Sequence, residues 1–223
     1  DAELIYVGKH GKDCKTTWKQ ENINQLLVDK ARQGKNVVRL KGGDPFIFGR
    51  GGEEALALRE ASIPFEIVPG ISSSIAAAAY AGIPVTHRKV ATSFAVVAGH
   101  EDPLKDTSSV NWKSLATAVD TLVILMGVGN IQTIVAELIV DGRDANTPAA
   151  AVSYGTTTKQ QTITSTLVAL PKTIELADIG APAAIIIGEV VKLRDQLSWF
   201  VHDITPQLQN AEQTVTAWAG MLE

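Results

Sequence analysis

Short apolar runs alternate with segments of helical periodicity along this chain of 223 residues. Residues 22–33, NINQLLVDKARQ, place Ile23, Leu26 and Leu27 at the spacing of one helix face, and Gly34 predicts where the helix ends. Runs of β-branched and aliphatic residues predict strands on either side of it. The predicted strands cover residues 4–7, 37–40, 65–68, 93–98, 121–125, 149–153, 161–167 and 183–187. This alternation is typical of the α/β class.

Further helices are predicted between these strands and near the end of the chain. They cover residues 52–61, 72–81, 131–140 and 193–200. Thr205 and Pro206 combine a capping side chain with a proline that suits the first helical turn, so an extra C-terminal helix is predicted there. The polar, proline-bearing stretch Glu101–Ser109 predicts a boundary between two α/β domains, residues 1–102 and residues 103–223.

Residues 37–54, VVRLKGGDPFIFGRGGEE, are the most informative stretch of the chain. A predicted strand stops at Gly42 and Gly43, and two residues without Cβ allow a ligand to approach the backbone closely. Asp44 follows and can accept hydrogen bonds from hydroxyls or an amine. Ligands of open α/β sheets sit outside the carboxyl ends of strands, so a nucleotide-like cofactor is predicted here. The alternative is a tight strand-to-helix turn in which Asp44 is only a capping residue.

Charge and cysteine content narrow the class of protein. The formal net charge is −4, from 20 Lys and Arg against 24 Asp and Glu, which gives no overall positive field for nucleic acid. No apolar run has the length of a membrane span, and no secretory signal is present. A single cysteine, Cys14, excludes an internal disulfide and fits a reducing, cytoplasmic location. No Cys/His group has metal-ligand spacing, so no metal is predicted.

Three segments carry a resemblance to a known family. They are residues 37–54, residues 68–88 (VPGISSSIAAAAYAGIPVTHR) and residues 182–200 (PAAIIIGEVVKLRDQLSWF). Together they closely resemble the uroporphyrinogen-III C-methyltransferases of the tetrapyrrole methylase superfamily, and the likeness extends over nearly the whole chain. The GGDP motif is shared across the superfamily, whereas FGRGGEE and GIPVTHR point to the uroporphyrinogen branch.

The resemblance implies two α/β domains with S-adenosyl-L-methionine (SAM) bound in the cleft between them, usually in a homodimer. It implies transfer of two methyl groups to uroporphyrinogen III, through precorrin-1 to precorrin-2, for siroheme or cobalamin synthesis. The co-product would be S-adenosyl-L-homocysteine (SAH). Relative to the family pattern, roughly fifty N-terminal residues with the first strand are missing. We therefore expect a truncated N-terminal domain and a chain that is poorly stable or inactive by itself.

The resemblance also assigns roles to single residues. Lys9 matches a catalytic proton donor of relatives, and its plain alternative is a solvated lysine after a strand. Pro182 and Ala183 are implied to line the adenine pocket. For Met126 the alternative to cofactor contact is core packing. The implied cofactor contacts are Gly42, Gly43, Asp44, Ile47, Ser72, Ser73, Met126 and Gly155.

Uroporphyrinogen III carries eight carboxylates, so a positive cleft would favour its binding. Arg50 and Arg88 are the expected substrate-binding residues. Arg50 is preferred because a guanidinium pairs bidentately with a carboxylate, and its alternative is a surface salt bridge to Glu53 or Glu54. The full set of basic candidates is Arg39, Lys41, Arg50, His87, Arg88 and Lys89.

Three rival functions fit the same residues. The first is a methyltransferase that acts on a later corrin intermediate, which would differ in an acceptor pocket that one sequence does not reveal. The second is an inactive, truncated fragment that still binds SAM. The third is a plain nucleotide-binding module, which binding of SAM rather than ATP would exclude.

Overall fold

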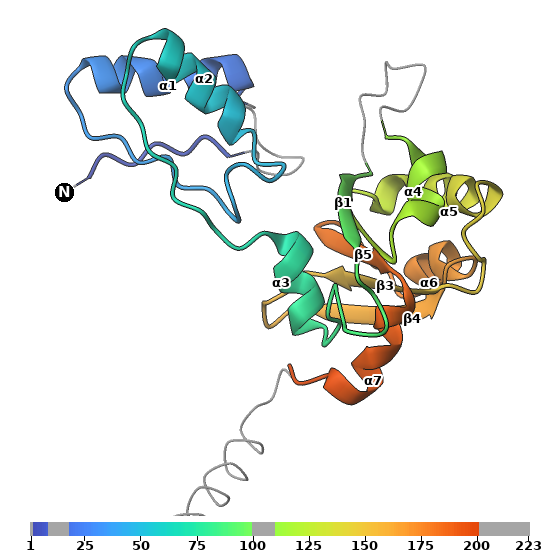
Figure 1. The fold of residues 1–223 in the computed structure, drawn as a ribbon. Helices are drawn as coiled ribbons and strands as arrows, with labels where there is room; N and C mark the ends of the chain where they lie inside the picture. Colours follow the sequence, from blue (N-terminus) through green and yellow to red (C-terminus); the bar gives the residue numbers. More distant parts are fainter. Residues whose placement is uncertain (1, 9–17, 100–109, 201–223) are drawn as a thin grey trace, which may run out of the picture. The chain divides into compact units, whose positions relative to one another are not determined.

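The computed structural model describes residues 2–8, 18–99 and 110–200, and the chain divides into two compact units, Asp1–Ser72 and Ser73–Glu223 (Figure 1). The predicted boundary between residues 102 and 103 stays a prediction, because the stretch proposed as the linker lies outside the described residues. The C-terminal helix predicted after Thr205 also lies outside them. Across the described ranges, no helix has the length and apolar character needed to cross a membrane.

A buried carboxylate holds the first unit together. Its two helices, α1 (Gln20–Arg32) and α2 (Gly51–Glu60), contact each other. Glu54 of α2 is 5% exposed, and its Oε1 accepts hydrogen bonds from Arg39 Nε (3.2 Å), Lys41 Nζ (3.0 Å) and Gln20 Nε2 (3.2 Å). Two cations offset the cost of burying this charge. Glu54 therefore connects both helices to the segment that leads into Gly42 and Gly43.

The strands predicted at residues 4–7, 37–40 and 65–68 are absent, because the described part of the first unit contains helices and turns but no strand. Apolar side chains of these segments are exposed: Leu4 by 92%, Val38 by 80% and Leu40 by 86%. A strand needs a hydrogen-bonded neighbour as well as a suitable side-chain pattern. The local side-chain pattern favoured strands but could not supply hydrogen-bonded partners, so these predictions are wrong for this structure.

The second unit contains a five-stranded mixed sheet in the order β1-β2-β5-β3-β4. β1 is parallel to β2, whereas β5 is antiparallel to both of its neighbours, β2 and β3. The carboxyl ends of β1, β2 and β3 therefore meet at one edge of the sheet. The strands are β1 (Phe94–Ala98), β2 (Thr121–Leu125), β3 (Pro148–Ser153), β4 (Gln161–Thr166) and β5 (Ala183–Ile187).

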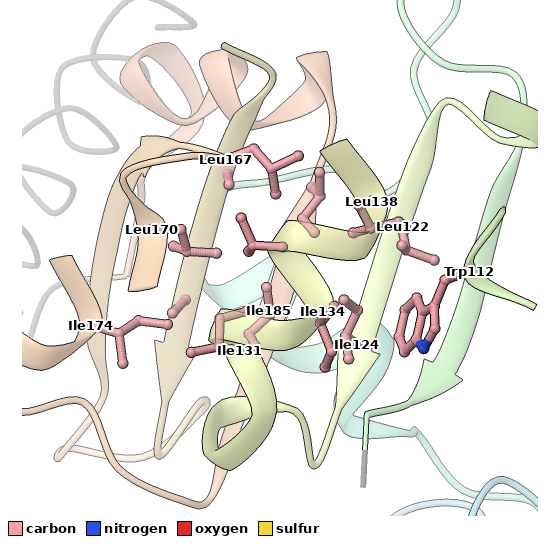
Figure 2. Close-up of a cluster of buried hydrophobic side chains, with 14 of the residues drawn as sticks. Trp112, Leu122, Ile124, Ile131, Ile134, Leu138, Leu167, Leu170, Ile174 and Ile185 are labelled. Carbon is pink, nitrogen blue, oxygen red and sulfur yellow. The ribbon is translucent and has the colours of Figure 1, made fainter. Parts of the chain in front are cut away.

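Helices cover both faces of this sheet. One hydrophobic cluster joins β2, β3 and β5 to α4 (Trp112–Ala118), α5 (Ile131–Val140) and α6 (Leu170–Leu176), and Figure 2 shows its side chains. A second cluster joins the opposite face to α3 (Ser73–Tyr80) and to the 3-10 helix η2 (Glu189–Leu193). The remaining elements are the 3-10 helix η1 (Val128–Asn130) and α7 (Arg194–Leu197).

Successive side chains of the central strands point to opposite faces of the sheet, and both faces are buried, which explains why these strands are apolar throughout. In β2, Leu122 and Ile124 belong to the first cluster, whereas Val123 and Leu125 belong to the second. Such burial on two faces is typical of sheets between helical layers. The predicted strands of this unit are confirmed, as are its predicted helices at α3 and α5. In the first unit, the predicted helices at α1 and α2 are confirmed. The helix predicted over residues 193–200 is shorter, and α4 and α6 were not predicted.

Asp120 links the amino ends of β1 and β2 by hydrogen bonds. Its Oδ2 accepts hydrogen bonds from the backbone N–H groups of Thr92 (2.8 Å) and Ser93 (3.1 Å) and from their hydroxyl groups (3.1 and 3.0 Å). The backbone N–H of Thr92 contributes most, and together these donors lower the pKa of Asp120 below its ordinary value of 3.8. Donors to the charged form favour ionisation.

We expect Asp120→Ala to lower the thermal midpoint (Tm) of the chain near neutral pH, because four hydrogen bonds to the carboxylate are lost. The folded pKa is depressed, so the stabilisation is complete above the unfolded value of 3.8 and is lost as the pH falls through the folded value. The difference in Tm between wild type and variant should therefore be constant at higher pH and narrow below about pH 4.

Thermal melts from pH 7 to pH 3 measure this difference. Asp195→Ala, which removes an exposed carboxylate from α7, is the control, and it should leave Tm nearly unchanged. A difference that keeps its size at the acid end would contradict the role of the Asp120 carboxylate.

Candidate functional site

The loop after Lys41 lies directly on the turn at residues 69–72. A Cβ added to Gly70 would overlap the carbonyl oxygen of Gly43, so the two backbones are in contact. Gly43 has φ +77°, a conformation that favours glycine. At Gly42 an added Cβ would meet no atom within 4 Å. The predicted glycine pair thus combines Gly43, which is favoured by its backbone conformation, with Gly42, whose backbone is open to a ligand.

Asp44 joins this loop to the turn. Its Oδ1 accepts a hydrogen bond from Phe46 N (2.8 Å) and its Oδ2 accepts one from Gly70 N (3.1 Å). The alternative of a capping role is therefore present in the structure. A carboxylate has lone pairs for about four hydrogen bonds, so Asp44 retains the capacity to bind a ligand as well. Its contact with a cofactor stays a prediction.

Two further predicted contacts of the first unit lie beside this loop. Ser72 is 6% exposed, and its Cα is 3.7 Å from the position of a Cβ on Gly43. Ile47 follows Asp44 in the same loop and is 43% exposed. The structure therefore gathers Gly42, Gly43, Asp44, Ile47 and Ser72 within one unit.

Two of the remaining predicted contacts lie in the second unit, at the edge where β1, β2 and β3 end. Met126 directly follows β2 and Gly155 lies in the turn after β3. Met126 is 52% exposed in the structure, and its contact with a cofactor stays a prediction. Met126 and Tyr154 have φ +57° and +46°. Such left-handed conformations cost about 1 kcal/mol or more in residues other than glycine and cluster at functional sites.

The turn after β3 packs directly on α3. A Cβ on Gly155 would lie 2.8 Å from the Cβ of Ala77, which is one turn after Ser73, the exposed first residue of the helix. Tyr154 N also donates a hydrogen bond to Pro182 O (3.1 Å) just before β5. The predicted contacts Ser73 and Gly155 and the predicted adenine-pocket residue Pro182 therefore lie on connected segments.

Sequence reasoning did not single out Gly99 or Tyr154, which the structure adds to this edge. Gly99 N donates to Leu125 O (2.7 Å), and Gly99 O accepts from Asn130 Nδ2 (2.9 Å). A glycine directly after a predicted strand was the available signal for Gly99. Tyr154 gave none, because its positive φ appears only in the folded backbone.

The basic candidates are largely paired with carboxylates. Arg50 forms a bidentate ion pair with Glu53, with Nε–Oε1 and Nη2–Oε2 distances of 2.7 Å, and both side chains are about half exposed. These hydrogen bonds raise the pKa of Arg50 and lower that of Glu53. The alternative of a surface salt bridge is therefore present. Arg39 and Lys41 are bound to Glu54. Substrate binding by Arg50 stays a prediction.

Arg88 has a different setting from the paired residues. It lies in the turn between His87 and Ala91, where His87 N donates to Ala91 O and Ala91 N donates back to His87 O, both at 2.9 Å. Its side chain is exposed, so it is accessible to an anion. Lys9 and Cys14 lie outside the described residues. Within the described ranges, no three His, Cys, Asp or Glu side chains are grouped to hold a metal ion.

Comparison with known proteins gives consistent matches. Residues 4–171 match the family described as Tetrapyrrole (Corrin/Porphyrin) Methylases. The chain is 52% identical over 206 residues to a uroporphyrinogen-III C-methyltransferase of Bacillus subtilis, a match over 92% of this chain and 79% of that protein. It is 54% identical over 201 residues to a siroheme synthase of Pseudomonas entomophila, a match over 90% of this chain and 42% of that protein.

A solved structure shows the same fold. Uroporphyrin-III C-methyl transferase from Thermus thermophilus, complexed with S-adenyl homocysteine, matches with a TM-score of 0.70 and 40% identity, over 85% of this chain and 78% of that one. The chain therefore spans most of the length of the Bacillus subtilis and Thermus thermophilus proteins. It spans less than half the length of the siroheme synthase.

We expect Asp44→Ala to speed amide hydrogen exchange at Phe46 and Gly70 by roughly tenfold, equal to about 1.4 kcal/mol, because each amide loses its charged acceptor. Exchange measured by NMR at constant pH tests this. Asp144→Ala is the matched control, since Asp144 Oδ1 likewise accepts from the N–H two residues later, at Asn146 (2.8 Å). Unchanged exchange at Gly70 would show that Asp44 does not hold the loop to the turn.

Proposed function

The chain belongs to the tetrapyrrole (corrin/porphyrin) methylase family, and we propose that it transfers two methyl groups from SAM to uroporphyrinogen III, giving precorrin-2. The observation that carries this proposal is the 52% identity, over 92% of the chain, to an enzyme of that name. The similar Thermus thermophilus structure is complexed with S-adenyl homocysteine, which supports SAM as the methyl donor.

The residues in both units suit SAM. The open backbone at Gly42 permits close approach of a ligand, and the Asp44 carboxylate can accept hydrogen bonds from hydroxyls or an amine. In the second unit, the half-exposed side chains of Met126 and Tyr154 offer apolar and aromatic surface at the edge of the sheet where Gly155 also lies. A ligand with a nucleoside and a charged amino-acid end needs this mixture of surfaces.

When bound, SAM supplies an electrophilic methyl group on a sulfonium that is already a good leaving group. The chain's own task is therefore to hold donor and acceptor in line, since orientation alone can supply much of the acceleration. As the pyrrole carbon is methylated, a proton must leave a neighbouring bridge carbon of the tetrapyrrole. An acid/base group is useful at this step. We propose Lys9, which matches a proton donor of the family pattern, as a catalytic residue of the chain.

The net charge of the chain is −4, so the chain as a whole does not attract an anionic tetrapyrrole. The carboxylates of the tetrapyrrole must therefore be bound by local clusters of positive charge. Arg50 and Arg88 are the proposed partners of its carboxylates. We further propose that precorrin-1 is bound as the intermediate, that the chain acts as a homodimer, and that it works in the cytoplasm. The family pattern supports the first two proposals, and the single cysteine is compatible with the third.

Isothermal titration with SAH tests the cofactor proposal. We expect binding near micromolar, about −8 kcal/mol, and its loss in Asp44→Ala but not in Asp144→Ala. Incubation with labelled SAM and uroporphyrinogen III should then place two methyl groups on each tetrapyrrole. Preference for ATP over SAH would indicate a plain nucleotide-binding module. SAH binding with no methyl transfer to uroporphyrinogen III would indicate a different acceptor or an inactive fragment.

Arg50→Ala should weaken binding of the tetrapyrrole by about tenfold, equal to about 1.4 kcal/mol, and leave SAH affinity nearly unchanged, because a bidentate carboxylate contact is lost. Glu53→Gln, which frees Arg50 from its ion pair, should strengthen tetrapyrrole binding. Arg59→Ala, an exposed arginine at the other end of α2, is the control. KM values for both substrates measure these effects, and equal loss of both affinities would count against the role of Arg50.

A further inference from the structure

Gln160 is a buried amide that lies between two segments of the candidate site. It is 7% exposed and follows the turn between β3 and β4. Its Oε1 accepts a hydrogen bond from Thr156 N (2.8 Å), and its Nε2 donates to Tyr80 O (3.2 Å) and reaches Thr162 Oγ1 (3.4 Å). An amide is suited to this place because it offers an acceptor and a donor on one rigid group.

The acceptor side of Gln160 holds the turn that carries Gly155. In this turn Tyr154 has φ +46° and Thr156 has φ +71°. Residues other than glycine stay in such conformations only when their surroundings hold them there. The hydrogen bond from Thr156 N to Gln160 provides one such restraint next to Gly155.

The donor side of Gln160 holds the end of α3, the helix that begins at Ser73. The last carbonyls of a helix lack partners within the helix. Here the carbonyl of Ala79 accepts from Trp199 Nε1 (2.9 Å), and that of Ala81 accepts from Arg194 Nη1. The carbonyl between them, Tyr80 O, accepts from Gln160. Trp199, Arg194 and Gln160 thus all donate to the end of α3. Gln160 in addition accepts a hydrogen bond from Thr156 N in the turn that carries Gly155.

The turn and the helix therefore meet at two kinds of contact. One is the close packing of Gly155 on Ala77, which fixes how near the two segments lie. The other is the Gln160 bridge, which resists sliding because both of its hydrogen bonds are directional. The predicted cofactor contacts Ser73 and Gly155 belong to the two segments so joined.

We propose that Gln160 is a positioning residue for the cofactor: it fixes the Gly155 turn relative to α3, so that both present their backbone to the ligand at a constant spacing. This inference rests on the proposed function. In the structure the amide of Gln160 contacts the backbone of both segments, so its effect on the ligand is exerted through them.

Gln160→Met tests this, because methionine has a similar length and volume but makes none of these hydrogen bonds. In the full chain we expect the dissociation constant of SAH to rise about tenfold, equal to about 1.4 kcal/mol. The KM for SAM should rise in parallel, whereas kcat at saturating SAM should stay within about twofold. Gln161→Met, at the exposed neighbouring position of β4, should leave all three values unchanged.

Gln160→Glu separates positioning from a general loss of stability. As a carboxylate near pH 8, residue 160 cannot donate to Tyr80 O, so SAH affinity should fall. Protonation restores a donor and an acceptor, and burial favours the neutral form. SAH affinity of this variant should therefore recover as the pH is lowered toward 6. The ionisable neighbours Lys159, Tyr154 and Arg194 are the same in Gln160→Met, which should show no such recovery.

Amide exchange at Thr156 provides a readout that does not need the ligand. It should become faster in Gln160→Met and recover at low pH in Gln160→Glu. If the wild-type chain binds no SAH, the proposed function fails, while this exchange still decides whether the bridge exists. Unchanged SAH affinity in folded Gln160→Met, or Gln160→Glu that does not recover on acidification, would overturn the inference. If Gln160→Met does not fold, the pH series of Gln160→Glu decides.

Discussion

The antiparallel strand β5 between β2 and β3 is the constraint on which the second unit depends. Its side chains alternate between the two hydrophobic clusters, and Ile185, Ile186 and Ile187 are fully buried. Because both of its neighbours run opposite to it, β2 and β3 run in the same direction. This orientation brings Met126 and Gly155, which follow the two strands, to one edge of the sheet. The hydrophobic core thus sets the position of the candidate site.

In both units one polar side chain holds a loop of the candidate site by its backbone. Asp44 connects its loop to Gly70, and Gln160 connects the Gly155 turn to the end of α3. In each case a glycine in close contact with a neighbouring segment lies beside the polar bridge: Gly70 against Gly43 and Gly155 against Ala77. Packing determines how near the segments approach, and the directional hydrogen bonds determine their register. A ligand held by backbone groups depends on both.

The charges of the first unit limit how an anionic tetrapyrrole could bind there. Glu54 takes up Arg39 and Lys41, so these cations stabilise the unit rather than remain available. The Arg50 ion pair with Glu53 is exposed, and pairs of this kind are worth less than about 1 kcal/mol. A multiply charged substrate can therefore displace Glu53 from Arg50 at small cost, whereas removing the partners of buried Glu54 would be expensive.

The sequence by itself determined the family, the glycine pair at residues 42–43 and the elements with a strong local pattern. The bounds of β2, α5 and β5 followed from apolar runs and helical spacing, which are local properties. Helices α4 and α6, at seven residues each, were too short for such a pattern. Only the tertiary structure decided which predicted strands find partners and what Gln160 does. Its partner Tyr80 is 80 residues away in sequence, and hydrogen bonds over such separations depend on packing that no local pattern contains.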